Sequence, residues 1–137
     1  MQFNPHVSFN GNCEEAFRFY QKILGGEIVT MMPYLGTPAE NFVPQQWRNK
    51  IMHAALQYDG AVLMGGDAPP ERYQKPQGFG VGLEVKNAHE AARIFNAFAD
   101  GGQVQMPRQE TFWALSFGML TDRFGIPWMI NCGKSQG

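Results

Sequence analysis

Two stretches of alternating polar and apolar residues each precede a segment with helical periodicity. In residues 6–10 the apolar Val7 and Phe9 alternate with polar side chains, and residues 80–85 alternate in the same way. A period of two is typical of a strand that packs one face against a core. We therefore expect two strands whose second faces are not apolar. These second faces carry His6, Ser8 and Asn10 in the first strand, and Gly80, Gly82 and Glu84 in the other.

The segments that follow these strands have the pattern of two similar amphipathic helices. Apolar residues recur on one stripe of each segment, which predicts that each helix buries one face. Each helix begins after an asparagine, Asn12 or Asn87, with a glutamate three residues later, which is the spacing of a capping box. Glycine pairs at 25–26 and 101–102 then supply the backbone freedom that helix C-termini commonly use. The matching ends indicate an internal duplication.

Further strand segments follow each helix and are joined by short turns. Residues 53–58 and 61–64 flank an Asp-Gly pair, which favours a tight hairpin. Residues 113–121 and 126–131 flank a turn that begins at Asp122. The order strand, helix and three strands therefore occurs twice, which predicts an α+β fold.

Length and composition fit one compact domain. The chain has 137 residues, of which 44% are hydrophobic and 17% are charged, so it can bury a sizeable core. We expect a single domain over residues 1–137, with modules at about 1–68 and 78–132 and a linker at about 69–77.

The balance of charges and the lack of long apolar runs exclude several classes of partner. Eleven Lys and Arg against twelve Asp and Glu give a net charge of −1, which provides no electrostatic attraction for nucleic acid or an anionic membrane. No apolar run approaches the roughly 20 residues that span a bilayer, and the N-terminal residues lack the pattern of a secretory leader. We therefore expect a cytoplasmic protein with neither a nucleic-acid nor a membrane partner.

The two cysteines provide no framework for a disulfide or a metal site, because Cys13 and Cys132 lack C-x-x-C spacing. Cys13 stands at the start of a predicted helix, where the helix dipole could lower its pKa. The interpretation as a small, buried apolar residue is favoured. Asp67 has two interpretations, as a cap for the linker or as a residue at the mouth of a binding site.

Five segments with distinctive motifs are spread over nearly the whole chain. The early motif is Asn-Gly-x-x-Glu-Glu-Ala-Phe-x-Phe-Tyr, and the late one is Asp-Arg-Phe-Gly-x-Pro-Trp. The segments are residues 9–20, 50–54, 63–69, 110–114 and 122–131. Together they resemble the PhnB-like branch of the vicinal oxygen chelate superfamily, which includes glyoxalase, bleomycin-resistance and dioxygenase proteins. The resemblance implies two βαβββ modules that form a cup-shaped mixed β-sheet, commonly completed as a homodimer.

The resemblance also implies where a metal ion would be held. In metalloenzymes of the superfamily, the ligands come from the first and last strands of each module. Carried over by position, the four sites are His6, Met64, Gly80 and Met129. Glycine has no donor side chain and methionine offers a soft thioether, whereas Mg, Mn, Fe(II) and Zn favour carboxylate or imidazole. Only His6 suits such an ion, so we expect no metal and no other cofactor.

The residues and the resemblance together predict a small-molecule ligand. We expect metal-independent binding of a small, partly aromatic or apolar molecule, with contact area from Met64, Met129 and Trp113. Simple core packing of the two methionines is the alternative. The polar side chains that alternation assigns to the same face are His6, Ser8, Asn10, His53, Gln57, Glu84, Ser116 and Asn131.

A metal-dependent enzyme is the alternative function. His6, His53 and Glu84 could form a relocated site of two histidines and one carboxylate, which suits a lyase, an isomerase or a dioxygenase. His53 could also act as a catalytic general base, because imidazole titrates near neutral pH. The simpler interpretation is that both histidines line a pocket and hydrogen-bond to a ligand. The sequence leaves open whether the protein is an enzyme.

Overall fold

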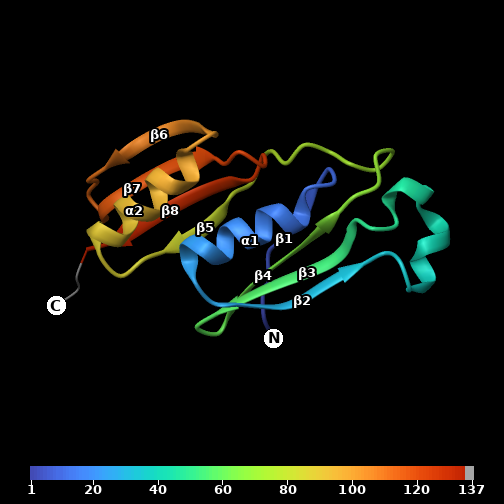
Figure 1. The fold of residues 1–137 in the computed structure, drawn as a ribbon. Helices are drawn as coiled ribbons and strands as arrows, with labels where there is room; N and C mark the ends of the chain where they lie inside the picture. Colours follow the sequence, from blue (N-terminus) through green and yellow to red (C-terminus); the bar gives the residue numbers. More distant parts are fainter. Residues whose placement is uncertain (135–137) are drawn as a thin grey trace. The chain divides into compact units, whose positions relative to one another are not determined.

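The computed structural model describes residues 1–134 of the chain. The chain divides into two compact units, the first from Met1 to Lys75 and the second from Pro76 onward. Each unit repeats the order strand, helix and three strands (Figure 1). The α+β class and the doubled βαβββ order predicted from the sequence are therefore confirmed. No helix among the described residues is both long and apolar enough to cross a bilayer.

The first unit is an open, four-stranded mixed sheet with one helix. The strand order is β1-β4-β3-β2, and β1 runs parallel to β4 while the other neighbours are antiparallel. Two short 3₁₀ helices occupy the connection between β2 and β3. The elements are β1 (His6–Phe9), α1 (Cys13–Leu24), β2 (Glu27–Pro33), η1 (Pro38–Phe42), η2 (Gln45–Trp47), β3 (Ile51–Tyr58) and β4 (Ala61–Asp67).

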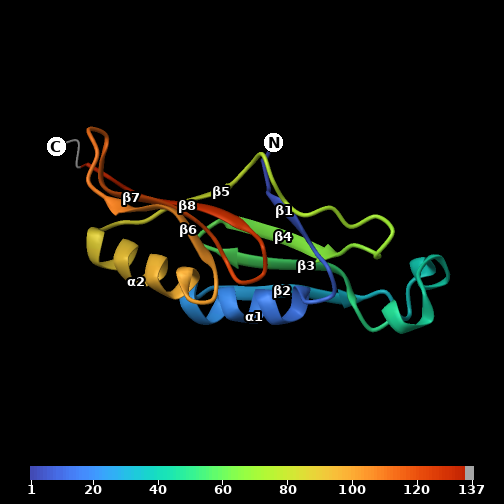
Figure 2. The same cartoon turned by 90° about the horizontal axis from the view of Figure 1, so that it is seen from above.

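The second unit repeats this topology with a much shorter connection between its second and third strands, residues 110–113 in place of 34–50. Its strand order is β5-β8-β7-β6, with β5 parallel to β8 and the other neighbours antiparallel. Figure 2 shows a single helix on one side of the sheet in each unit. The other side of each sheet is therefore free of its own helix. The elements are β5 (Val81–Glu84), α2 (Ala88–Ala99), β6 (Gln103–Gln109), β7 (Ala114–Thr121) and β8 (Pro127–Gly133).

Aromatic side chains fill the space between α1 and the first sheet. Phe9, Phe17 and Tyr20 are fully buried, and their rings meet edge to face at centroid distances of 6.0 Å. A Cβ atom at Gly65 would lie 2.8 Å from the Val7 carbonyl oxygen and 2.9 Å from the Phe17 ring. Glycine at this position therefore lets the helix approach the middle of the sheet.

The second core is built in the same way on the side of α2. Phe98 is fully buried, and its ring lies 4.8 Å from that of Trp128. A Cβ atom at Gly118 would lie 2.5 Å from the Phe95 ring, so this glycine again permits close packing. Because side chains alternate along each strand, one face of each sheet packs against its helix and the other face does not.

The two helices differ in how their N-termini are capped. The Asn87 side chain accepts a hydrogen bond of 2.8 Å from the Glu90 amide, as predicted. The predicted capping box at Asn12 is wrong, because the Asn12 side chain makes no such bond. The Asp67 carboxylate accepts hydrogen bonds from the N-terminus of α1 instead. Its Oδ1 accepts from the Gly11 and Cys13 amides, both at 2.9 Å, and its Oδ2 accepts from the Ile51 amide at 2.8 Å.

Asp122 plays a similar buried role in the second unit. The predicted turn is present, since the Gly125 amide donates to the Asp122 carbonyl at 3.0 Å. The Asp122 carboxylate also accepts from the Phe124 and Ile126 amides and from the Trp128 indole nitrogen. Asp122 is 3% exposed. It therefore ties the turn to the core as well as forming the turn.

Candidate functional site

The face of the first sheet opposite α1 brings two histidines and a methionine together. His6 on β1 pairs in register with Met64 on β4, and Met64 pairs with Ala55 on β3. His53 lies two residues from Ala55 and therefore on the same face. The His6 and His53 ring centroids are 6.1 Å apart, and the ring planes differ by 19°. Three residues predicted for the site thus gather on this face.

The position of His6 changes its protonation. Burial lowers the pKa of His6 below its ordinary value of 6.5, and the nearby charge of His53 lowers it further. A hydrogen bond with the backbone acts in the opposite direction but is the smallest of the three causes. His6 is therefore largely neutral at pH 7, so that its ring can both donate and accept a hydrogen bond.

Two further predicted residues lie near this histidine face. Ser8 is on β1, two residues beyond His6, and is partly exposed. Asn10 is exposed in the bend after the last residue of β1, Phe9. Strand alternation therefore places Ser8 on the histidine face but does not determine the position of Asn10.

The face of the second sheet opposite α2 combines a carboxylate, an amide and aromatic rings. Glu84 on β5 pairs with Asn131 on β8, which pairs in turn with Phe117 on β7. The Asn131 amide nitrogen donates to both carboxylate oxygens of Glu84, at 2.8 and 2.9 Å. The Trp113 ring meets the Phe117 ring edge to face at 5.4 Å. Met129 lies two residues before Asn131 and thus on the same face.

Ser116 is not on this face, so its assignment by alternation is wrong. Ser116 is only 2% exposed and pairs with Cys132, which is fully buried on the helix side. A register shift between Ala114 and Ser116 marks an irregularity in β7. Burial still alternates along the whole of β7, and Ser116 lies on the buried side with Leu120.

Phe117 is the residue of this face that the sequence analysis missed. It lies between Trp113 and Asn131, and it shares its face with Met119, two residues further along β7. Counting the alternation backward from Met119 would have found it, because buried and more exposed residues alternate along the whole of β7.

The residues at the positions implied for a metal do not fit a divalent ion. His6 and Met64 are register neighbours in the first unit. In the second unit Met129 pairs with Gly82, and a Cβ atom at Gly80 would lie 3.6 Å from the Met129 Cγ. The donors are therefore one imidazole, two thioethers and no side chain at the glycine position. Zn, Fe(II), Mn and Mg prefer other donors.

Acidic and thiol groups do not complete such a site elsewhere in the part of the chain that the structure describes. Within residues 1–134, no three His, Cys, Asp or Glu side chains are grouped so that they could hold a metal ion. Asp67 is 2% exposed and is occupied by backbone amides, so it belongs to the core and not to the mouth of a site. Burial, together with Asp67 and Glu14, raises the pKa of Cys13 strongly, which makes its thiol unreactive.

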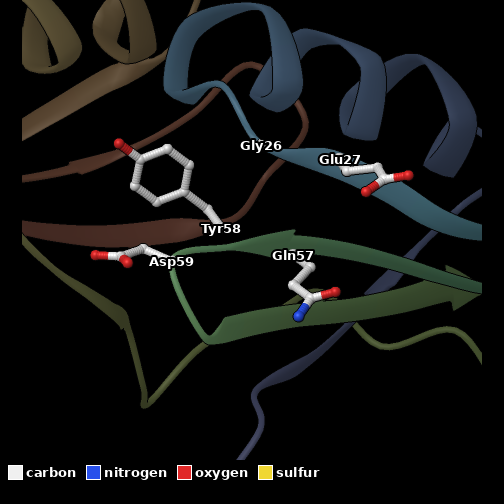
Figure 3. A pocket seen from close by; sticks show the side chains of 5 residues that line it. All are labelled: Gly26, Glu27, Gln57, Tyr58 and Asp59. Carbon is white, nitrogen blue, oxygen red and sulfur yellow. The ribbon is translucent and has the colours of Figure 1, made fainter.

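A hollow of about 340 Å³ lies at the turn end of β3, away from these residues. Figure 3 shows that the Gln57 and Tyr58 side chains leave the strand in opposite directions, so they do not converge on one point. Among the polar residues that alternation assigns to the ligand face, Gln57 lines this hollow and the others do not. It is lined by Gly26, Glu27, Gln57, Tyr58 and Asp59.

Comparisons with known proteins agree with this architecture. The family model described as Glyoxalase/Bleomycin resistance protein/Dioxygenase superfamily matches residues 2–130. Protein YjdN of Escherichia coli (strain K12) is 37% identical to this chain over an alignment of 145 residues. The alignment covers 99% of this chain and 98% of YjdN. These two matches extend over nearly the whole chain and confirm the resemblance found in the motifs.

Solved structures of related proteins have the same fold. Protein PA1353 from Pseudomonas aeruginosa is 46% identical, with a TM-score of 0.89 and coverage of 98% of this chain and 99% of that one. A protein from Bacillus cereus described as a putative 3-demethylubiquinone-9 3-methyltransferase, PhnB protein, is 21% identical, with a TM-score of 0.79. Coverage there is 97% of this chain and 100% of that one. At that identity the likeness shows the fold alone.

Proposed function

Because the chain belongs to the glyoxalase/bleomycin resistance/dioxygenase superfamily, we propose that it binds a small, partly aromatic or apolar molecule without a metal ion. One observation carries this proposal. The sheet face opposite the helix, in each unit, places hydrogen-bonding side chains directly beside methionine or aromatic surface. Binding sites for small organic molecules combine an apolar lining with a few polar groups in this way.

In the first unit the proposed ligand contacts are His6, Ser8, His53 and Met64. Met64 stands next to His6 in the sheet and offers an adaptable apolar surface. The two imidazoles can donate or accept hydrogen bonds at the edges of that surface. Asn10 follows β1 in an exposed bend and remains a predicted contact.

In the second unit the proposed contacts are Glu84, Trp113, Met129 and Asn131, and we add Phe117 because its ring packs against that of Trp113. Trp113 keeps 47% of its surface exposed, although it packs against Phe117. An exposed indole on a sheet face is a surface on which an aromatic ligand can pack. The carboxylate and the amide then provide the polar contacts.

The second candidate function is that of a metal-dependent lyase, isomerase or dioxygenase. The pair of nearly parallel imidazoles, His6 and His53, is the observation that favours it. Glu84, the third predicted ligand, is already hydrogen-bonded through both oxygens to Asn131. In this alternative His53 would be the general base. Within residues 1–134, no three His, Cys, Asp or Glu side chains are grouped so that they could hold a metal ion, which argues against it.

Three of our expectations remain predictions. They are the homodimer, the cytoplasmic location, and the assembly of the two units, with their linker at about 69–77, into one domain with a shared cup. The edge strands are β1 and β2 in the first sheet and β5 and β6 in the second. Their unpaired backbone groups favour pairing with another chain.

Thermal unfolding in the presence and absence of a strong chelator separates the two candidate functions. A binder that needs no metal is unaffected by the chelator but is stabilised by members of a panel of small aromatic compounds and thiol conjugates. At about a hundred times its dissociation constant, a ligand raises the free energy of unfolding by about 2.7 kcal/mol. Loss of stability in the chelator would favour the enzyme, and no response to either would contradict both proposals.

A further inference from the structure

Within the described residues, the Glu84 carboxylate is an exposed anion without a cationic partner. Glu84 lies on the edge strand β5 and is exposed. No ion pair within residues 1–134 includes it, and its hydrogen-bond partner is the neutral Asn131 amide. A carboxylate has about four lone-pair positions and the Asn131 amide uses two, so acceptor capacity remains.

Asn131 contributes a second acceptor that lacks a donor. Its Oδ1 is buried and has no hydrogen-bond partner among the described residues. The orientation of the amide is determined by Glu84, because the reversed orientation would place Oδ1 against the carboxylate oxygens. Buried polar atoms nearly always have a partner, so an orphaned acceptor indicates a missing donor.

The sheet beside these two acceptors is bare. Gly82 lies two residues before Glu84 and on the same face of β5, and a Cβ atom there would meet nothing within 4 Å. Close packing of the described residues therefore does not explain this glycine, in contrast to Gly65 or Gly118. Met129, the register partner of Gly82, provides an apolar wall for this space.

We infer that this corner of the second sheet binds an organic cation, namely a protonated amine, amidinium or guanidinium carried on a small apolar or aromatic body. The cationic nitrogen donates to the Glu84 carboxylate and to Asn131 Oδ1, and the body lies over Gly82 against Met129. Charge-assisted hydrogen bonds of this kind are stronger than neutral ones. This inference rests on the proposed function, because it assigns the chemical class of the ligand.

The experiment compares four probes of similar size: benzylamine and phenylguanidine as cations, benzyl alcohol as the neutral analogue, and benzoate as the anion. Binding is measured by NMR titration of the full chain, following the Gly82 backbone amide and the Asn131 side-chain amide. We expect both cations to shift these signals, with weaker binding of benzyl alcohol and none of benzoate. In Glu84→Gln, the affinity for the cations should fall about 10-fold or more.

Two variants serve as controls for the effect of charge and for the position of the ligand. Glu71→Gln changes the net charge equally at an exposed position outside the strands and should leave cation binding unchanged. Gly82→Val fills the bare sheet with a β-branched side chain suited to a strand, so cation binding should be lost while the unfolding curve is retained.

The possible outcomes separate this inference from the proposed function. Equal binding of cationic and neutral probes, unaffected by Glu84→Gln, would overturn the cation site and leave the proposed small-molecule binding in place. Absence of any shift at Gly82 and Asn131 with all four probes would also overturn the cation site. The proposed function is then decided by the separate thermal panel of aromatic compounds and thiol conjugates.

Discussion

The His6 imidazole lies beside a second imidazole on a sheet face, and this neighbour affects the protonation of His6. The His6 and His53 rings lie 6.1 Å apart, so the charge of His53 makes a proton on His6 unfavourable. Partial burial of His6 acts in the same direction, because the charged form loses hydration. Both causes lower the pKa of His6, so the folded protein holds this residue neutral where the unfolded chain would protonate it.

The stability of the protein should therefore fall as the pH falls below about 6.5. In that range the unfolded chain binds a proton at His6 that the folded state rejects, so protonation favours unfolding. We expect His6→Gln to remove part of this pH dependence in urea unfolding curves. His89→Gln, an exposed position on α2, is the control for the loss of one histidine. An NMR titration that gives the folded His6 a pKa at or above 6.5 would contradict the argument.

At the scale of elements, two helices with the same sequence signature are capped by different groups. Asn87 caps α2 through its own side chain, as the local spacing predicts. At α1 the buried carboxylate of Asp67, from the end of β4, accepts the amides of Gly11 and Cys13. Because a carboxylate near a helix N-terminus also interacts favourably with the helix dipole, it can replace the local cap. Asp67 further holds β3 through the Ile51 amide.

Substituting the two asparagines should therefore have unequal effects. Asn87→Ala removes a capping bond and should lower the free energy of unfolding by about 1 kcal/mol. Asn12→Ala removes no side-chain capping bond and should change it little. Asp67→Asn should cost about 2 kcal/mol or more, because an amide cannot accept from donors on both of its ends. Equal losses for the two alanine variants, measured by urea unfolding, would contradict this assignment of the caps.

At the scale of the whole chain, the order of elements could be predicted because it depends on local patterns. Alternation and helical stripes identified both modules, and the glycine pairs marked where the helices end. The role of Asp67 could not be predicted, since it depends on contacts with residues up to 56 positions away in the sequence. The face of Ser116 was assigned wrongly for a different reason: buried and more exposed residues alternate regularly along β7, but alternation alone does not show which of the two faces is the buried one.

Local patterns also predicted part of the candidate site and missed the rest. Residues in regular strands, such as His6, Met64 and Met129, lie on the faces that alternation gives them. The bond between Glu84 and Asn131 joins two strands that are 47 positions apart, so neither residue alone indicated it. Contacts of this kind depend on sheet register, which a single sequence determines only indirectly.

The exposed edges of the two sheets favour a homodimer. The edge strands β2 and β6 carry apolar side chains that remain exposed, with Val29 at 47% and Val104 at 44%. An edge strand leaves a row of backbone groups unpaired, and these groups can pair with a strand of another chain. We expect sedimentation to give twice the 15.4 kDa mass of one chain. If the dimer forms through β2, Val29→Lys should shift the protein toward monomer. If it forms through β6, Val104→Lys should do so. A wild-type protein that sediments as a monomer at high concentration would show that neither edge pairs.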